Sequence, residues 1–278
     1  MTSHERADLW LIGGGNMGGA MLRRWIEAGT HDPKKVIVID PGDPVVPPGV
    51  RVVRTSEELW EQEASLFPLI MVLAVKPQQM RAASRIIMPA LSGNPAVVVS
   101  ILAGVDEATV RSAMHADSVV RAMPNLPVGI GKGAVALYST TAGEHERSQV
   151  EALIRPLGLM EWIENEALFD VVAALTASGP GFLYRFIDAL AEGAAALGLP
   201  PEQAQRLATA TVEGAGALVA SSGESPHQLA ERVASPGGIT RQGLNVLDDG
   251  KALNQLVHRT LEAAVRRSRE MGEEARSR

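Results

Sequence analysis

The sequence predicts an α/β fold in two parts. Residues 1–164 are expected to form a Rossmann domain with a mostly parallel, doubly wound sheet, and residues 165–278 are expected to form an all-helical domain. In the first part, short apolar runs alternate with helical patterns, which is typical of strands buried on both faces of a parallel sheet. The second part contains no convincing strand, and long helical patterns follow one another to its end.

Apolar runs and helical periodicity place the expected elements along the chain. Strands are expected at 8–12, 36–39, 51–53, 69–75, 96–102, 119–123, 134–138 and 159–163. Helices of the first part are expected at 16–28, 78–91, 106–114 and 144–154. Helices of the second part are expected at 167–175, 181–197, 201–221, 226–233, 240–247 and 253–276. Gly29 stops the first helix, and Pro201 stands at a helix start, where proline is tolerated.

The composition fits a soluble enzyme of one or two domains. The chain has 278 residues, a net charge of −6 and no cysteine. The negative charge argues against nucleic acid or an anionic membrane as the main partner. The lack of cysteine excludes disulfides, thiolate metal sites and a cysteine nucleophile. The longest apolar runs are too short to span a membrane, and the polar first residues do not resemble a signal peptide, so a cytoplasmic protein is expected.

The histidines and the paired acidic residues do not indicate a metal or catalytic site. The six histidines are scattered singly without metal-ligand spacing, so no metal is expected and all six are expected on the surface. Asp248 and Asp249 precede Gly250 and are interpreted as a helix end and turn rather than a catalytic pair.

A glycine-rich motif near the N-terminus indicates a cofactor class. Gly13, Gly15 and Gly18 have the G-x-G-x-x-G spacing between a strand and an amphipathic helix. The first glycine permits a tight turn, the second lets a pyrophosphate approach the backbone, and the third lets the helix pack close to its strand. The helix N-terminus would hold the pyrophosphate, whereas the simpler alternative is a plain strand–helix turn. The predicted dinucleotide contacts of this turn are Ile12, Gly13, Gly14, Gly15, Asn16, Met17 and Gly18.

Asp40 ends the second predicted strand, 22 residues after Gly18. An acidic side chain at this place hydrogen-bonds the adenosine ribose hydroxyls of NAD and repels the 2′-phosphate of NADP. The chain continues with Pro-Gly-Asp-Pro and has no basic residue until Arg51. The expected cofactor is therefore NAD(P)H, with NADH favoured over NADPH. In the alternative interpretation Asp40 only caps the turn before Pro41, and Arg51 or Arg54 tolerates a phosphate.

The helices of the second part are rich in alanine and glycine, as at 189–198 and 208–222. Glycine inside a helix costs about 1 kcal/mol relative to alanine, so a close helix–helix approach must offset it. Packing within one chain would suffice for this. However, roughly 110 residues of helices form a thin core on their own, which favours an interlocked dimer.

Five short segments, in order along nearly the whole chain, carry a resemblance to a known family. They are Ile-Gly-Gly-Gly-Asn-Met at 12–17, Ala-Val-Lys-Pro at 74–77, Arg-Ala-Met-Pro-Asn-Leu-Pro at 121–127, Ala-Leu-Thr-Ala-Ser-Gly-Pro-Gly-Phe at 174–182, and Ser-Pro-Gly-Gly-Ile-Thr at 235–240. Together they resemble the pyrroline-5-carboxylate reductases, which make proline from a cyclic imine. The resemblance implies NAD(P)H-dependent reduction of 1-pyrroline-5-carboxylate to L-proline, and a homodimer through the helical domain or a larger ring of dimers.

Two further segments are candidate cofactor contacts because they follow strands at the carboxyl edge of the sheet, where such folds bind ligands. The resemblance implies that Lys76 and the turn made by Ala74, Val75, Lys76 and Pro77 touch the nicotinamide side of the cofactor; otherwise Lys76 is a solvated lysine. The amide of Asn125 can bond the carboxamide or a ribose hydroxyl, and an ordinary Asn turn is the alternative. Arg121 is interpreted as structural.

The segment at 235–240 lies between two helical patterns and opens the second. Its successive amides and the helix dipole can hold a carboxylate without any arginine, although a connecting turn capped by serine has the same composition. The predicted substrate contacts are Ser235, Gly237, Gly238 and Thr240. The resemblance implies that the hydroxyl of Thr240, the predicted catalytic group, reaches the ring nitrogen of a bound imine and donates or relays a proton.

Two other functions remain open from the sequence. The main alternative is a β-hydroxyacid dehydrogenase or another imine-reducing NAD(P) oxidoreductase. Those dehydrogenases use a lysine in the helical half, where this chain has only Lys251, in an apparent turn. A non-catalytic nicotinamide-binding scaffold is the second alternative, and the complete 235–240 segment argues against it.

Overall fold

The computed structural model describes residues 7–63, 68–88 and 97–276. Within these residues eight strands form one sheet, close to the predicted positions. The strands are β1 (Leu9–Ile12), β2 (Val36–Ile39), β3 (Arg51–Val53), β4 (Ile70–Leu73), β5 (Val97–Ser100), β6 (Val119–Met123), β7 (Gly133–Tyr138) and β8 (Gly158–Trp162). Residues 89–91 of one expected helix and residue 96 of one expected strand lie outside the described residues.

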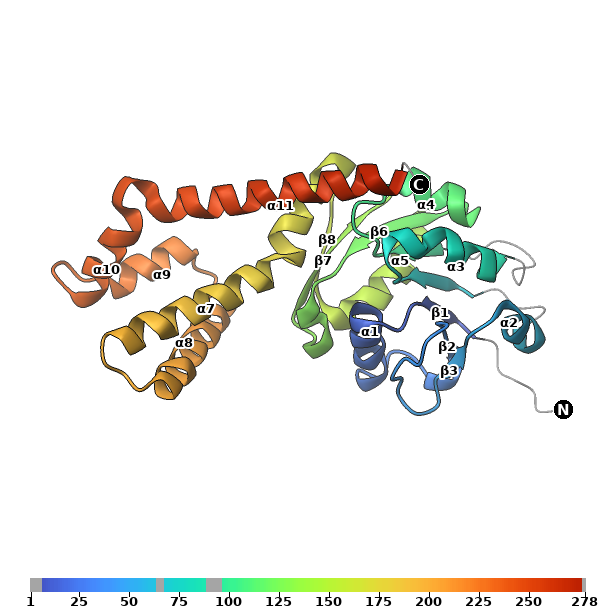
Figure 1. Cartoon of the computed structure of the whole chain (residues 1–278), viewed down its shortest axis with the longest axis horizontal. Helices are drawn as coiled ribbons and strands as arrows, with labels where there is room; N and C mark the ends of the chain where they lie inside the picture. The colour runs from blue at the N-terminus through green and yellow to red at the C-terminus, as the bar shows by residue number, and fades with distance from the viewer. Residues whose placement is uncertain (1–6, 64–67, 89–96, 277–278) are drawn as a thin grey trace. The chain divides into compact units, whose positions relative to one another are not determined.

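The strands are arranged in the order β3-β2-β1-β4-β5-β6-β7-β8 (Figure 1). The strands β1 to β6 all run parallel to one another, β7 is antiparallel to β6, and β8 is parallel to β7. The predicted, mostly parallel Rossmann sheet is therefore confirmed. Because β1 has β2 on one side and β4 on the other, the winding direction reverses at β1. The carboxyl end of β1 is thus the switch point at which such sheets bind ligands.

Helices cover both faces of this sheet. On one face lie α1 (Asn16–Glu27) and α5 (Glu144–Ile154), and on the other lie α2 (Ser56–Glu63), α3 (Met80–Ile87) and α4 (Glu107–Met114). In β1, Leu9 and Leu11 enter the core under α1, whereas Trp10 and Ile12 enter the core under α3. The central strands β1, β2 and β4 are therefore apolar along their whole length, which is why the sequence located them well.

One helix, α2, was not expected from the sequence. Its segment Ser-Glu-Glu-Leu-Trp-Glu-Gln-Glu is strongly acidic. Leu59 is buried in the core beneath α3, and the hydroxyl of Thr55 accepts a hydrogen bond from the amide of Glu58 at 3.2 Å. With only two apolar residues among eight, the segment gives too weak a periodic signal to be recognised.

The chain divides by compactness into one unit that contains Met1–Ser178 with Ala264–Arg278, and a second unit, Gly179–Ala263. The first unit extends beyond the predicted boundary at residue 165 for two reasons. Phe169 in α6 (Phe169–Val172) packs with Met123 and Ala136 of the sheet. At the far end of α11 (Ala252–Arg276), Ser268 Oγ donates a hydrogen bond to Asp170 Oδ1 at 2.6 Å.

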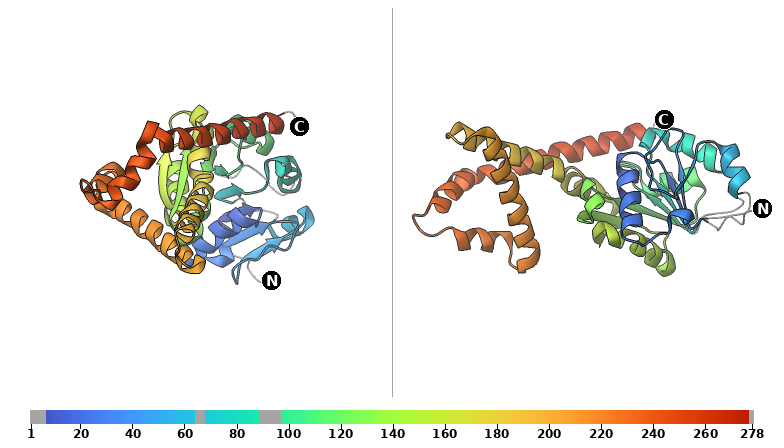
Figure 2. Two further views of the ribbon diagram at one scale, coloured as in Figure 1. Left: turned by 60° about the vertical axis from the view of Figure 1, so that its left-hand side comes forward. Right: turned by 90° about the horizontal axis from the view of Figure 1, so that it is seen from below.

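The second unit consists of helices. They are α7 (Gly179–Ala196), α8 (Pro201–Ser222), α9 (Pro226–Val233), α10 (Ile239–Asp248) and the first part of α11. The first two pack side by side as a helical hairpin (Figure 2). Every residue of this unit is described, and its few buried residues are Ala191, Ala204, Ala208, Leu229 and Ala234. The unit therefore has almost no core of its own.

Among the described residues, one helical stretch, Glu166–Ala196, is long and apolar enough to cross a membrane by length and composition alone. It is interrupted by the π-helical turn Ala173–Ala177 and by a bend at Ser178. Several of its large apolar side chains are exposed, among them Leu183, Tyr184 and Phe186. Since a core helix satisfies the same test, this stretch by itself is weak evidence of a membrane segment.

Candidate active site

The glycine-rich turn lies at the switch point of the sheet. Gly13 has a positive φ of 99°, and its amide donates to the carbonyl of Ile39 at 2.9 Å. A Cβ on Gly13 would stand 2.6 Å from the carbonyl oxygen of Ala74, and one on Gly18 would collide with the carbonyl oxygen of Gly13. Both positions thus require glycine, because β1, β4 and α1 approach one another through bare backbone.

The start of α1 is open to a ligand. Gly15 is its N-cap, and no side chain caps the first amides of the helix. No acidic residue lies in its first turn, and a Cβ built on Gly15 would meet no atom within 4 Å. Unsatisfied N–H groups with the positive end of the helix dipole are a binding site for a phosphate group. The geometry therefore fits the pyrophosphate of a dinucleotide.

A cleft of about 420 Å³ extends from this turn between the ends of β2 and β4 and the side of α3. Its lining includes these predicted cofactor residues: Ile12, Gly13, Gly15, Asn16, Asp40, Ala74, Val75 and Lys76. The predicted contacts Gly14, Met17, Gly18, Pro77 and Asn125 do not line it. Its other wall was not predicted from the sequence and is made by Ile39, Pro41, Gln79, Ala82, Ala83 and Ile86. The available signal was the spacing of Ala82, Ala83 and Ile86, which share one side of α3.

The carboxylate of Asp40 is held by two backbone amides. Its Oδ2 accepts from the amide of Gly14 at 2.7 Å, and its Oδ1 accepts from the amide of Gly42 at 2.8 Å. Asp40 therefore joins the glycine-rich turn to the loop after β2 and also lines the cleft. Both sequence interpretations, the turn cap and the cofactor contact, are compatible with this position.

Lys76 follows β4 at the cleft and is exposed. Its amide donates to Gln79 Oε1 at 3.2 Å, and its carbonyl accepts from the amide of Gln79 at 2.8 Å. These bonds close the turn Pro77–Gln79 at the start of α3. Gln79 thus fixes the backbone of the Ala-Val-Lys-Pro segment at the cleft.

Asn125 is buried, and both polar atoms of its side chain form hydrogen bonds within the protein. Its Oδ1 accepts from the amide of Ala134 at 2.9 Å, and its Nδ2 donates to the carbonyl of Thr176 at 3.0 Å. Thr176 lies in the π-helical turn, a feature that frequently marks functional sites. Asn125 therefore ties the carboxyl end of β6 to this turn. Its predicted contact with the cofactor stays a prediction.

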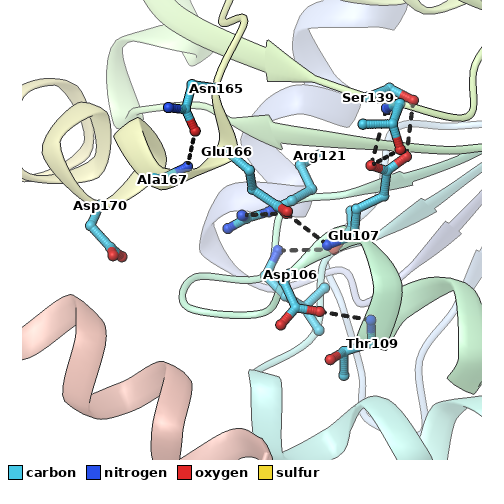
Figure 3. A network of polar contacts seen from close by, with 12 residues as sticks. Asp106, Glu107, Thr109, Arg121, Ser139, Asn165, Glu166, Ala167 and Asp170 are labelled. Atoms are coloured by element: carbon cyan, nitrogen blue, oxygen red, sulfur yellow. Dashed lines mark hydrogen bonds and ion pairs between the residues drawn. The ribbon is translucent and has the colours of Figure 1, made fainter.

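A polar network fixes the segments around Arg121 (Figure 3). Arg121 is buried, pairs with Glu166 Oε1 at 2.8 Å, and lies over the ring of Phe169. The amide of Glu107 also donates to Glu166 Oε1, at 2.8 Å. The buried carboxylate of Glu107 accepts from the hydroxyls of residues 139–141 after β7 and from the amides of residues 140 and 141. The network joins four parts of the chain, so Arg121 has the structural role expected from the sequence.

The 235–240 segment forms the predicted turn and helix start in the second unit. Gly238 is the N-cap of α10, its amide donates to the carbonyl of Ser235 at 2.9 Å, and no side chain caps the helix. Ser235 and Thr240 are exposed, and Gly237 has a positive φ of 72°. The first amides of α10 are thus available to an anion, as the carboxylate hypothesis requires.

An ion pair that sequence reasoning missed holds this segment. Arg241 Nη2 lies 2.5 Å from Glu231 Oε2 and also donates to the carbonyl of Ala234 at 3.3 Å. A second bond joins Arg241 Nη1 to Glu231 Oε1 at 3.2 Å. The bond to Arg241 is the largest cause of the lowered pKa of Glu231. The pair fastens the start of α10 to the end of α9, and no local pattern in the sequence indicates it.

Within residues 7–63, 68–88 and 97–276, no group of three or more His, Asp and Glu side chains is arranged to hold a metal ion. His115, His145, His227 and His258 are exposed, as expected. His31 differs from the expectation of a surface position, because it is partly buried beside Trp25; burial lowers its pKa, while the charge of Asp8 acts in the opposite direction. His4 lies outside the described residues.

Known proteins resemble both parts of the chain. Residues 166–271 match the family model described as pyrroline-5-carboxylate reductase dimerisation. The pyrroline-5-carboxylate reductase of Synechocystis sp. is 34% identical over 276 residues, which are 95% of this chain and 98% of that protein. The chain belongs to the pyrroline-5-carboxylate reductase family. Another relative, pyrroline-5-carboxylate reductase 3 of Danio rerio, is 34% identical over 94% of this chain and 90% of its own. Residues 9–104 also match the model described as NADP oxidoreductase coenzyme F420-dependent.

Solved structures of this family have the same fold. The pyrroline-5-carboxylate reductase of Coxiella burnetii has a TM-score of 0.84 at 30% identity, over 96% of this chain and 99% of that one. The Plasmodium falciparum pyrroline carboxylate reductase, solved with NADP bound, has a TM-score of 0.81 at 26% identity, over 97% of this chain and 100% of that one. The likeness thus extends over both the Rossmann and the helical parts.

Proposed function

We propose that this reductase converts 1-pyrroline-5-carboxylate to L-proline with NAD(P)H, the last step of proline biosynthesis. The observation that carries the proposal is the 34% identity to a named reductase over 95% of the chain. Two features of the structure support it: the open glycine-rich turn beside the cleft, and the uncapped start of α10 in the second unit.

The residues of the cleft fit a nicotinamide dinucleotide. The pyrophosphate would lie against the amides at the start of α1, where a Cβ on Gly15 would have open space. Asp40 would accept hydrogen bonds from the adenosine ribose, and the backbone of residues 74–77 would lie toward the nicotinamide. The bound nicotinamide would supply the hydride.

The substrate carboxylate would be held by the amides of Gly237, Gly238 and the first turn of α10, with Ser235 beside them. Hydride addition to the carbon of the C=N bond moves an electron pair onto nitrogen, which takes up a proton. We assign the donation or relay of that proton to the hydroxyl of Thr240. A cyclic imine is basic enough to enter partly protonated, so a strong general acid is not needed.

The reaction is tested by the oxidation of NADH and NADPH in the presence of 1-pyrroline-5-carboxylate, with proline identified as the product. Protein that binds the reduced cofactors and never consumes them with this imine would exclude the proposal. Oxidation of 3-hydroxy acids with NAD(P) would instead favour the dehydrogenase alternative. Lys251, the lysine of the helical half, is exposed and lies in a turn with a positive φ of 59°.

We further propose that NADH is preferred over NADPH, because the carboxylate of Asp40 lines the cleft at the end of β2. The measurement is kcat/KM for both reduced cofactors in the wild type and in Asp40→Ser. We expect the wild type to favour NADH and the variant to shift toward NADPH. A wild type that favours NADPH, or a variant with an unchanged ratio, would show that Asp40 does not discriminate.

Two further proposals concern the oligomeric state of the enzyme and its location in the cell. The matched dimerisation region and the scarcity of buried residues between Gly179 and Ala263 support a homodimer through the helical unit. We propose that dimers can assemble further into a ring, and that the enzyme acts in the cytoplasm. Light scattering of the purified protein tests the ring, and fractionation of the source cells tests the location.

A further inference from the structure

Arg54 lies beside the adenosine end of the proposed cofactor site. It follows Val53, whose carbonyl accepts a hydrogen bond from the amide of Asp40 at 3.0 Å, and β2 and β3 are paired in parallel with Ile39 opposite Val53. Asp40 and Arg54 are therefore neighbours across one strand spacing, about 4.8 Å, at the carboxyl edge. An arginine side chain can span that distance to reach a group attached to the ribose that Asp40 would bind.

The guanidinium of Arg54 is occupied by an acidic neighbour. Its Nη2 lies 2.7 Å from Asp43 Oδ1, and both side chains are solvent-accessible, Arg54 at 46% and Asp43 at 93%. The backbone amide of Arg54 donates to Glu58 Oε2 at 2.8 Å, which fixes the base of the side chain. Arg54 is thus held at its backbone and paired at its tip.

The loop that carries Asp43 is fixed to the glycine-rich turn. The amide of Gly42 donates to Asp40, and the ring of Pro44 lies so close to Gly14 that a Cβ there would come within 2.5 Å of Pro44 Cβ. Asp43 stands between these two anchored residues. Its carboxylate is therefore presented to Arg54 by a loop with defined contacts.

We propose that Arg54 is the residue able to bind an adenosine 2′-phosphate and that Asp43 withholds it, so that the Asp43–Arg54 pair sets the cofactor specificity of this reductase together with the carboxylate of Asp40. The inference rests on the proposed nicotinamide site. A 2′-phosphate entering there would meet the carboxylates of Asp40 and Asp43 and would have to take Arg54 from Asp43. An exposed ion pair is weak, whereas an arginine–phosphate contact is charge-assisted and bidentate. Removal of the single charge of Asp43 should therefore suffice to release Arg54.

The experiment compares Asp43→Asn, Arg54→Gln and the double variant. One readout is the ratio of kcat/KM for NADPH to that for NADH, and the other is the affinity for 2′,5′-ADP by calorimetry, which needs no turnover. We expect Asp43→Asn to raise both by about tenfold, and the double variant to lose the whole gain. Asp8→Asn is the matched control, because Asp8 pairs with Lys35 just before β1, at the other edge of the sheet. It removes the same charge and should leave both readouts unchanged.

An unchanged ratio and affinity in Asp43→Asn would overturn the inference, and so would a double variant that keeps the gain. An equal gain in Asp8→Asn would show a general charge effect and would also overturn it. Failure of the proposed reaction can be told apart from failure of this inference. A protein without reductase activity can still bind 2′,5′-ADP, and the calorimetry would show whether that affinity depends on Arg54. If the wild type prefers NADPH, Arg54→Gln alone must lower that preference for the assignment to hold.

Discussion

Thr240 is the residue on which the proposed chemistry depends most directly. It is exposed in the first turn of α10, beside the uncapped amides that would hold the substrate carboxylate. We expect Thr240→Ala to lower kcat on the order of 10²-fold, because the imine nitrogen loses its positioned proton donor. Steady-state kinetics with pyrroline-5-carboxylate measures this, and fluorescence titration should show nearly unchanged NADH affinity.

Thr240→Ser is the matched control for that experiment, since it keeps the hydroxyl and should retain most of the activity. Wild-type turnover in Thr240→Ala would show that solvent supplies the proton and that Thr240 has no catalytic role. A loss of activity in Thr240→Ser equal to that in Thr240→Ala would point to the methyl group and to packing instead.

Gly15 and Gly18 should respond differently to the same added methyl group. A Cβ on Gly18 would collide with the carbonyl oxygen of Gly13, so Gly18→Ala should lower the melting temperature by several degrees. A Cβ on Gly15 would meet open space on the ligand side, so Gly15→Ala should keep the melting temperature and weaken NADH binding. Thermal unfolding and NADH titration of both variants check this, and a stable Gly18→Ala would contradict the packing described for the turn.

At the scale of elements, the Arg241–Glu231 pair holds the start of α10 against the end of α9. We expect Arg241→Ala to raise KM for the imine by about tenfold, because the amides at 237–240 lose their fixed arrangement. Glu231→Gln should act in the same direction, and the double variant should add little. Steady-state kinetics measures the effect, while Arg232→Ala, which breaks the pair with Glu224, serves as the control.

The same pair has a defined pH dependence. The hydrogen bond to Arg241 lowers the pKa of Glu231, so the pair is fully formed above the ordinary glutamate pKa and is lost as the pH falls through the lowered value. We therefore expect the difference in KM between the wild type and Arg241→Ala to disappear below this pH range. A difference that persists there would show that the effect of the substitution does not depend on the ion pair.

The elements that the sequence predicted well are those whose pattern is set by burial on both faces. The strands from β1 to β6 fall within a residue or two of the expected ranges. The signal is clearest in β1, β2 and β4, which are apolar throughout because helices cover both of their faces. The glycine spacing likewise predicted the turn at the end of β1, since backbone contact at Gly13 and Gly18 admits no side chain.

Contacts between distant residues were not predictable from local pattern. Asn125 is joined to Thr176 and Ala134, and nothing near position 125 encodes these partners. Asp43 with Arg54, and Glu231 with Arg241, become pairs only when the loop after β2 and the α9–α10 turn have folded. The α3 wall of the cleft was missed for a similar reason, because an apolar side of a helix predicts burial without saying that part of it faces a ligand.

At the scale of the whole molecule, the helical unit leaves exposed the large apolar side chains that a core would bury. Large apolar side chains remain accessible on α7, α8, α10 and α11, including Leu218 at 48%, Val246 at 73% and Leu256 at 56%. Its buried residues are mostly alanines, and α7 and α8 pack through Ala191, Ala204 and Ala208. These alanines let the two helices approach closely. The glycines inside the helices are not explained by this contact, because a Cβ built on Gly193, Gly214 or Gly216 would meet no atom within 4 Å.

The apolar faces of the helical unit lead to a prediction about the oligomeric state. We expect the wild type to sediment as a dimer or larger at nanomolar concentration, because an isolated unit with so little core would be marginal. Leu256→Glu places a charge on the exposed apolar side of α11 and should produce monomer, with a loss of thermal stability because folding of the helical unit depends on its partner. Leu159→Glu is the control, since Leu159 is 62% exposed on the edge strand β8 and lies in the other unit. A stable, active wild-type monomer, or a Leu256→Glu variant that sediments with the wild type, would show that these faces are not the dimer interface.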